Sequence, residues 1–158
     1  MGRDWIQFLA KEEVRIEETG ELDLYLQTEE KQLLSELTTQ FLQDLRREFS
    51  DCIKAFNAYR GEQRNTIKIY GIQGTQSDFL VFRNSLKLIV AFERPGTIGF
   101  TFNSLQGGVK SGKKLDSDLI EVNLGPFNEG IWKFKNQVVH LQSIVRYYLT
   151  EFIRNSMN

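Results

Sequence analysis

The fold of this chain is decided by residues 28–61, which read TEEKQLLSELTTQFLQDLRREFSDCIKAFNAYRG. Apolar side chains recur there every three or four residues, at Leu34, Leu37, Phe41, Leu45, Phe49, Cys52, Phe56 and Tyr59. That spacing keeps them on one stripe of an α-helix, which completes a turn every 3.6 residues. Thr28 is a suitable N-cap, and Gly61 is a suitable residue to end the helix. The sequence therefore predicts one long amphipathic helix.

The predicted helix is long compared with the domain that carries it. About 31 residues at roughly 1.5 Å each span about 46 Å, whereas a compact chain of this length is about 40 Å across. We therefore expect the helix to curve, to break near Ser50-Asp51, or to pack against a second copy of the chain. The last alternative predicts a homodimer with Leu34, Phe41 and Leu45 at its interface.

Length and composition indicate one globular domain over residues 1–158, since 41% of the 158 residues are hydrophobic and 26% are charged. We expect residues 1–12 to form a loosely docked amphipathic arm. The lone Cys52 excludes an internal disulfide and is typical of a reducing compartment. No apolar run is long enough to span a bilayer, and the N-terminus has no hydrophobic signal core. A cytoplasmic protein without a membrane partner is therefore expected.

Charge is distributed unevenly, although the net charge is only −1. Residues 1–30 contain three basic and nine acidic side chains, whereas residues 31–158 contain seventeen basic and twelve acidic ones. An acidic arm of this kind either shields a mildly basic body from competing anions or is simply a solvated face. Both interpretations stay open at this point.

After residue 61 the apolar period changes from 3.6 to 2, which is typical of strands. We predict about six strands, around residues 67–70, 79–82, 86–92, 98–102, 120–124 and 131–135. Pro95-Gly96 fits the central pair of a type II turn, because glycine supplies the positive φ of the second position. A second helix is predicted from Asn136 almost to the end. Residues 14–26 predict a hairpin with Gly20 in its turn, unless their second half extends the long helix.

These elements predict an α+β fold with an antiparallel sheet of about six strands in a meander. The long helix and the C-terminal helix are available to cover its apolar face. The element order resembles the helix-grip arrangement of START and Bet v 1-like proteins, in which a curved sheet grips a C-terminal helix over a cavity. The resemblance covers most of the chain and rests on topology. It implies a cavity between the sheet and the terminal helix.

Aromatic residues on the predicted strands and on the last helix are the candidates for lining such a cavity: Phe100, Phe102, Trp132, Phe134 and Tyr148. Aromatic side chains at strand spacing also commonly belong to a core. A sheet that binds nucleic acid would instead expose aromatic residues beside lysines. The outward set consists of Lys68, Tyr70, Lys87, Lys133 and Lys135, so only one aromatic residue accompanies its lysines.

A glycine-rich segment over residues 107–114 satisfies the pattern G-x-x-x-x-G-K. It has Lys114 where a P-loop needs Ser or Thr to hold Mg²⁺, and a strand rather than a helix is predicted to follow. Nucleotide hydrolysis is therefore not expected. Lys110, Lys113 and Lys114 stay candidates for an anion-binding loop, with a solvated loop as the alternative.

Other residue types give no catalytic signature. The single His140 and the single Cys52 cannot build the usual zinc shell, and no G-x-S-x-G motif accompanies the histidine. Asp116 and Asp118 form a carboxylate pair that suits acid-base or Mg²⁺ chemistry, but such pairs beside lysines more often keep a loop soluble. We expect no catalytic residue, metal or cofactor.

Three functional hypotheses follow. The first is a non-enzymatic intracellular binding protein that holds an apolar ligand or a partner segment between the sheet and the terminal helix. The second is a nucleic-acid-binding module that uses the sheet and loop lysines. The third is a dimeric adaptor or secretion-chaperone-like protein that uses the acidic arm and the long helix. A cavity of several hundred Å³ under the terminal helix favours the first, and a continuous basic stripe favours the second.

Overall fold

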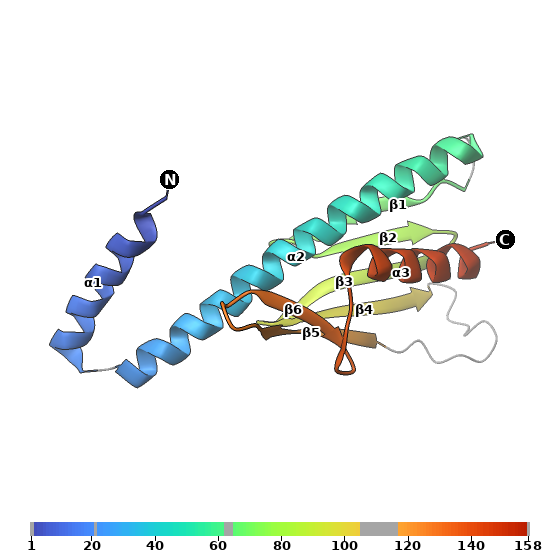
Figure 1. Ribbon diagram of the computed structural model, residues 1–158. Coiled ribbons are helices and arrows are strands. Elements are labelled where there is room, and N and C mark those ends of the chain that lie inside the picture. The colour runs from blue at the N-terminus through green and yellow to red at the C-terminus, as the bar shows by residue number, and fades with distance from the viewer. Residues whose placement is uncertain (1, 21, 62–64, 105–116, 158) are drawn as a thin grey trace. The chain divides into compact units, whose positions relative to one another are not determined.

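A computed structural model describes residues 2–20, 22–61, 65–104 and 117–157 (Figure 1). Met1–Leu33 and Leu34–Asn158 form two compact units, and each is described by itself. The elements in chain order are α1 (Asp4–Thr19), α2 (Leu22–Arg60), β1 (Lys68–Gly71), β2 (Phe79–Arg83), β3 (Leu86–Arg94), β4 (Thr97–Ser104), β5 (Ser117–Leu124), β6 (Gly130–Phe134), β7 (Gln137–Val138) and α3 (Leu141–Asn155).

The helix α1 replaces the first arm of the predicted hairpin, so that prediction was wrong. Gly20 has a φ of +70° and donates its N–H to the carbonyl of Ile16 over 2.7 Å, which ends the helix in a left-handed residue. The alternation of Val14 and Ile16 covers too few residues to outweigh the strong helix formers around it. Residues 22–26 extend the long helix, as the alternative prediction held.

The long helix α2 begins at Leu22, so Thr28 is not its N-cap. Neither glycine nor proline interrupts residues 22–28. The helix is unbroken at Ser50-Asp51. It ends at Arg60, and Gly61 has a φ of +94° and donates its N–H to the carbonyl of Asn57 over 3.1 Å. The prediction that Gly61 ends the helix is confirmed.

The seven strands of the described residues form one antiparallel sheet in which each strand pairs with the next in sequence, so the predicted meander is confirmed. Residues that face each other across neighbouring strands share one face of a sheet. The register sets Phe79 opposite Val90, Val90 opposite Phe100, and Phe100 opposite Asp118. These four residues therefore lie on one face, which we call the inner face.

Both α2 and α3 pack on the inner face, as the predicted α+β arrangement requires (Figure 1). Phe41 of α2 stacks on Trp132 of β6 with ring centroids 4.5 Å apart, and Phe49 meets Phe79 of β2 edge to face at 5.6 Å. These contacts take α2 obliquely across the sheet. The buried apolar core consists of Leu42, Leu45, Phe49, Ile53, Ile67, Phe79, Val81, Leu86, Leu88, Val90, Ile98, Phe100, Ile120, Val122, Trp132, Ile144, Val145, Tyr148, Leu149 and Phe152.

The segment before α3 differs from the prediction of a helix from Asn136. Lys135 and Asn136 have φ angles of +49° and +66° and form a tight turn after β6. The chain then returns as the short strand β7, with Val138 opposite Lys133. Asparagine enters the left-handed region more readily than most residues, which suits it to this turn. The helix starts only at Leu141.

The turn at Pro95-Gly96 has the backbone that a type II turn requires, since Gly96 has a φ of +89°. The Gly96 N–H donates to Oγ1 of Thr38 in α2 over 2.8 Å, and its carbonyl accepts the Val122 N–H over 2.9 Å. Thr38 in turn donates its hydroxyl to the Leu34 carbonyl over 2.6 Å. The turn thus links α2 to two neighbouring strands.

Candidate functional site

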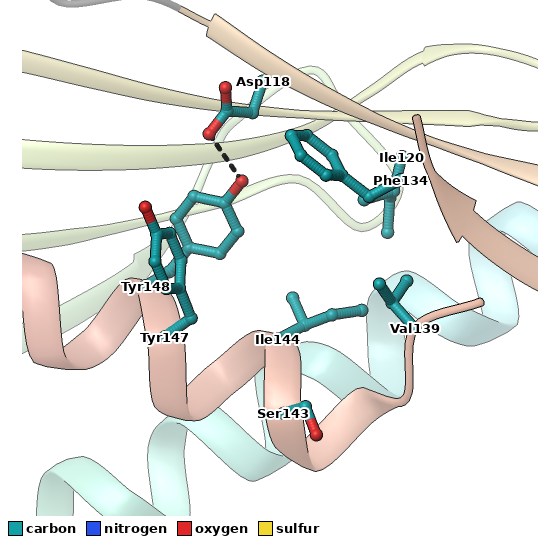
Figure 2. Close-up of a pocket in the computed structure, with 8 residues that line it drawn as sticks. All are labelled: Asp118, Ile120, Phe134, Val139, Ser143, Ile144, Tyr147 and Tyr148. Atoms are coloured by element: carbon teal, nitrogen blue, oxygen red, sulfur yellow. Dashed lines mark hydrogen bonds between the residues drawn. The ribbon is translucent and has the colours of Figure 1, made fainter. Parts of the chain in front are cut away.

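A cavity of about 300 Å³ lies between α3 and the strands β5 and β6 (Figure 2). β5 supplies two of its residues, β6 one, the segment after β7 another, and α3 the remaining four. The lining residues are Asp118, Ile120, Phe134, Val139, Ser143, Ile144, Tyr147 and Tyr148.

Asp118 lies on the inner face because side chains alternate along β5. Ile120 and Val122, two and four residues further on, are buried on that same face. The register sets Asp118 directly opposite Phe100 of β4. A carboxylate is thereby placed beside a fully buried aromatic ring, at the point where the inner face opens to the cavity.

Tyr148 connects α3 to both of these residues. Its ring stacks nearly parallel on Phe100, with centroids 4.2 Å apart and planes 3° apart. Its hydroxyl donates to Oδ2 of Asp118 over 2.7 Å (Figure 2). Burial raises the pKa of the Tyr148 hydroxyl, and the hydrogen bond and negative charge of Asp118 raise it further. Tyr148 therefore keeps its proton at neutral pH and donates it in the hydrogen bond to Asp118.

Tyr147 lies where the cavity meets solvent. Its ring meets Tyr148 edge to face, with centroids 5.1 Å apart and planes 89° apart, and 58% of the residue is exposed. Figure 2 shows its ring on the α3 side of the cavity, while the hydroxyl of Ser143 points away from the aromatic rings. Tyr147 thus forms a wall that solvent reaches.

The electrostatic character of the cavity comes from one residue. Of its eight described lining residues, only Asp118 carries a formal charge. The ammonium group of Lys135, which does not line the cavity, lies 5.2 Å from the centroid of the Phe134 ring. The site is an aromatic and aliphatic pocket with one carboxylate in its wall.

The five aromatic residues selected from the sequence separate into three groups. Phe134 and Tyr148 line the cavity. Phe100 lies behind Tyr148, and Phe102 is tilted against it with centroids 6.3 Å apart. Trp132 stacks on Phe41 and belongs to the core beneath α2.

Sequence reasoning considered Asp118 only as part of a carboxylate pair beside the loop lysines, and it did not select Tyr147 as a site residue. Asp118 was assigned to a polar loop because the predicted strand began at Ile120, whereas β5 begins at Ser117. The alternation of Asp118, Ile120 and Val122 was the signal that could have revealed its inward direction. Nothing in the spacing of Tyr147 along the sequence marks a cavity wall.

The three residues predicted at a dimer interface contact the sheet of their own chain. Leu45 has no exposed surface, and Phe41 is stacked on Trp132. Leu34 lies close to Gly96. The candidate anion-binding residues Lys110, Lys113 and Lys114 lie outside the described residues.

The lysines of the outer face do not form one stripe. Lys68 and Lys87 both lie opposite Phe82, on β1 and β3. Lys133 lies opposite the acidic Glu121, at the other end of the sheet. A continuous basic surface for nucleic acid is therefore not formed by these three lysines.

The other candidate residues from the sequence, the cysteine, the histidine and possible metal ligands, show no reactive or metal-binding arrangement in the described part of the chain. Burial, with the charges of Glu48 and Asp51, raises the pKa of the Cys52 thiol, so the thiolate nucleophile is disfavoured. His140 is the exposed N-cap of α3. Within the described ranges no three His, Cys, Asp or Glu side chains gather as metal ligands, and no helix combines the length and apolarity that crossing a membrane requires.

Comparison of the chain with protein-family models, with curated proteins and with solved structures gave no match.

Proposed function

We propose that this protein is a non-enzymatic binding protein that holds a small apolar ligand, or an apolar side chain of a partner segment, between the sheet and α3. The observation that carries the proposal is the cavity of about 300 Å³ under the terminal helix. Its volume is at the lower end of the range for small-molecule sites, which is about 300–1,000 Å³. The resemblance of the element order to the helix-grip arrangement, which rests on topology, points to the same place for a ligand.

The lining supports an apolar ligand in particular. Ile120, Phe134, Val139 and Ile144 present hydrocarbon surface to the cavity. Covering that surface with a ligand removes it from water, and each Å² of apolar area contributes about 25 cal/mol. A few polar groups in an otherwise apolar wall are the usual composition of a small-molecule site.

The test is a titration of the full chain with phenethyl alcohol, a neutral aromatic probe. Methyl NMR spectra are recorded at each step of the titration. We expect the methyl signals of Ile120, Val139 and Ile144 to shift in a saturable way. The methyls of Val81, a buried residue of β2 that does not line the cavity, serve as an internal reference and should stay in place. Native mass spectrometry of freshly purified protein reports any ligand that is already bound.

Two neighbouring valines provide a matched pair of variants. Val139→Phe fills the cavity and should abolish the probe-induced shifts. Val138→Phe adds the same side chain at a position that is 55% exposed and does not line the cavity, so binding should persist. Equal shifts in both variants, or no saturable shift in the wild type, would contradict the proposal.

A second candidate function, protein contact through α1, is favoured by the exposure of its apolar side chains. None of its residues is buried, and the exposed apolar set is Trp5, Ile6, Phe8, Leu9 and Val14. The helix carries five acidic and two basic side chains. A partner surface that is complementary to α1 would be apolar and bordered by basic residues.

This second candidate is tested with two synthetic amphipathic peptides, one of Leu and Lys and one of Leu and Glu. The Leu-Lys peptide should shift the fluorescence of Trp5 to shorter wavelength, and the Leu-Glu peptide should not. Leu9→Glu should remove the response, while Gln7→Glu, on the same helix, should keep it. Light scattering then shows whether a second copy is a partner, because the mass would rise from 18.4 kDa to twice that value.

A further inference from the structure

We propose that the cavity selects ligands that carry an ammonium group on an apolar body, with Asp118 as the partner of the ammonium. This inference rests on the proposed function, since it names the chemical class of ligand for the same cavity. Three observations carry it: the unshared oxygen of Asp118, the aromatic walls, and the direction of the hydroxyl groups.

Asp118 has acceptor capacity that its own chain does not use. In the described part of the structure its side chain accepts one hydrogen bond, from Tyr148 to Oδ2. An ionised carboxylate has about four lone-pair sites on its two oxygens. Apart from Ser143, the other described residues of the cavity wall are aromatic or aliphatic. A ligand that covers the cavity removes water from this charge, which is costly unless the ligand supplies a partner.

The aromatic walls suit the same charge. Cations are attracted to the faces of Phe and Tyr rings within about 6 Å of the centroid. Phe134, Tyr147 and Tyr148 all line the cavity beside Asp118 (Figure 2). One face of Tyr148 is already covered by Phe100. The ammonium of Lys135 already lies 5.2 Å from the Phe134 centroid, so a ligand ammonium depends on the tyrosine rings and on Asp118 rather than on Phe134.

The hydroxyl groups of the site do not suit an anion. Tyr148 already gives its proton to Asp118, and the hydroxyl of Ser143 points away from the rings (Figure 2). Neither arginine nor lysine is among the described lining residues. A carboxylate ligand would therefore meet the negative charge of Asp118 without a cationic partner among the described lining residues, and the hydroxyl of Tyr147 offers it only a neutral donor. We therefore expect ligands with an ammonium group to bind most tightly, neutral ligands to bind less tightly, and ligands with a carboxylate group to bind least tightly.

The experiment compares three probes with the same aromatic body and different charge: phenethylamine, phenethyl alcohol and phenylacetate. Each is titrated into the full-length protein at neutral pH, and dissociation constants are taken from the methyl shifts of Ile120, Val139 and Ile144. Phenethylamine should bind at least about tenfold more tightly than phenethyl alcohol, because charge-assisted hydrogen bonds are roughly twice as strong as neutral ones. Phenylacetate should give no saturable shift.

Asp118→Asn keeps the shape of the side chain and an oxygen for Tyr148, but removes the charge. The amine and the alcohol should then bind with similar affinity. Glu121→Gln is the matched control, since it removes a negative charge from the outer face of the same strand and should keep the tenfold preference. If Asp118→Asn does not fold, the probe preferences of the wild type and of Glu121→Gln still decide the outcome.

Two results would overturn the inference and differ in what they say about the cavity. If phenethyl alcohol binds the wild type within threefold of phenethylamine, or Asp118→Asn keeps the preference, the ammonium inference fails while ligand binding in the cavity stands. If none of the three probes moves the cavity methyls, the proposed function fails together with it.

Discussion

At the scale of single residues, Tyr148 is the side chain that joins the terminal helix to the sheet. Its ring lies on Phe100 and its hydroxyl on Asp118, two residues that the register places opposite each other. The stacking contact uses the face of the ring and the hydrogen bond uses its tip. One residue therefore positions α3 over both β4 and β5.

Tyr148→Phe tests this link. We expect the free energy of unfolding to fall by about 1–2 kcal/mol, because the partly buried carboxylate of Asp118 loses its donor. Urea midpoints measure the change. Tyr147→Phe removes the same atom from the exposed neighbouring tyrosine and should change stability by under about 0.5 kcal/mol. Equal losses in the two variants would assign the effect to the helix rather than to the hydrogen bond.

The same residue predicts a dependence on alkaline pH. The pKa of Tyr148 is raised in the folded protein above its ordinary value of 10.0. The unfolded chain therefore releases this proton first, and stability that is fully present below pH 10 declines as the pH rises above it. Tyr148→Phe should show a shallower decline of the unfolding free energy between pH 9 and pH 11, whereas the wild type and Tyr147→Phe should decline alike.

Arg83 is a buried charge whose removal should help the protein. The residue is 3% exposed, Nε and Nη1 have no hydrogen-bond partner among the described residues, and the guanidinium lies 5.4 Å from the centroid of the Phe56 ring. Burial, with the charge of Arg60, lowers its pKa. Arg83→Met should leave the free energy of unfolding unchanged or raise it by about 1 kcal/mol, since it keeps the apolar stem without the unpaired groups. A loss above about 1 kcal/mol in urea unfolding would show that the guanidinium contributes more than it costs.

At the scale of elements, the link between α2 and the Pro95-Gly96 turn depends on one hydroxyl. Thr38 is fully buried and accepts the Gly96 N–H. That turn also receives the Val122 N–H from β5. The position of α2 on the sheet is therefore specified by hydrogen bonds as well as by apolar packing, and apolar packing alone is not directional.

Thr38→Val should destabilise the protein by about 1–3 kcal/mol, because it leaves the Gly96 N–H without its acceptor. Thr39→Val is the control, since it makes the same change at the next residue of the same helix. Chemical denaturation of both variants provides the measurement. If the Thr38 variant were as stable as the Thr39 variant, the N–H of Gly96 would have to find another acceptor.

At the scale of the whole molecule, residues 1–33 and 34–158 are separate compact units. The helix α1 has no buried residue. Deletion of residues 1–20 should therefore change the free energy of unfolding of the remaining chain, measured by urea denaturation, by less than about 0.5 kcal/mol. A larger loss would mean that α1 stabilises the rest of the chain. The same truncated protein should keep the binding of phenethyl alcohol.

The amino-acid sequence by itself determined the helices and strands whose apolar residues follow a regular period. Apolar spacing over residues 34–59 is enough for a helix, and alternation from Leu86 to Phe102 is enough for two paired strands. Gly61 and Gly96 were predicted at positions that need a positive φ, and both have one. These features depend on neighbours in the chain, and local periodicity and backbone sterics report them directly.

Where the sequence pattern was short or came from a single residue, only the tertiary structure decided the local conformation and the position of the side chain. The turn at Lys135-Asn136 forms because β7 can pair with β6. The apolar residues after Asn136 have helical spacing, so the sequence predicted a helix there instead of the turn and β7. Asp118 is a cavity residue because the register sets it opposite Phe100 and α3 brings Tyr148 onto both. The sequence separations in that contact are 18 and 30 residues. Register and helix packing, which no local pattern encodes, bring such residues together, and so the cavity belongs to the fold rather than to a motif.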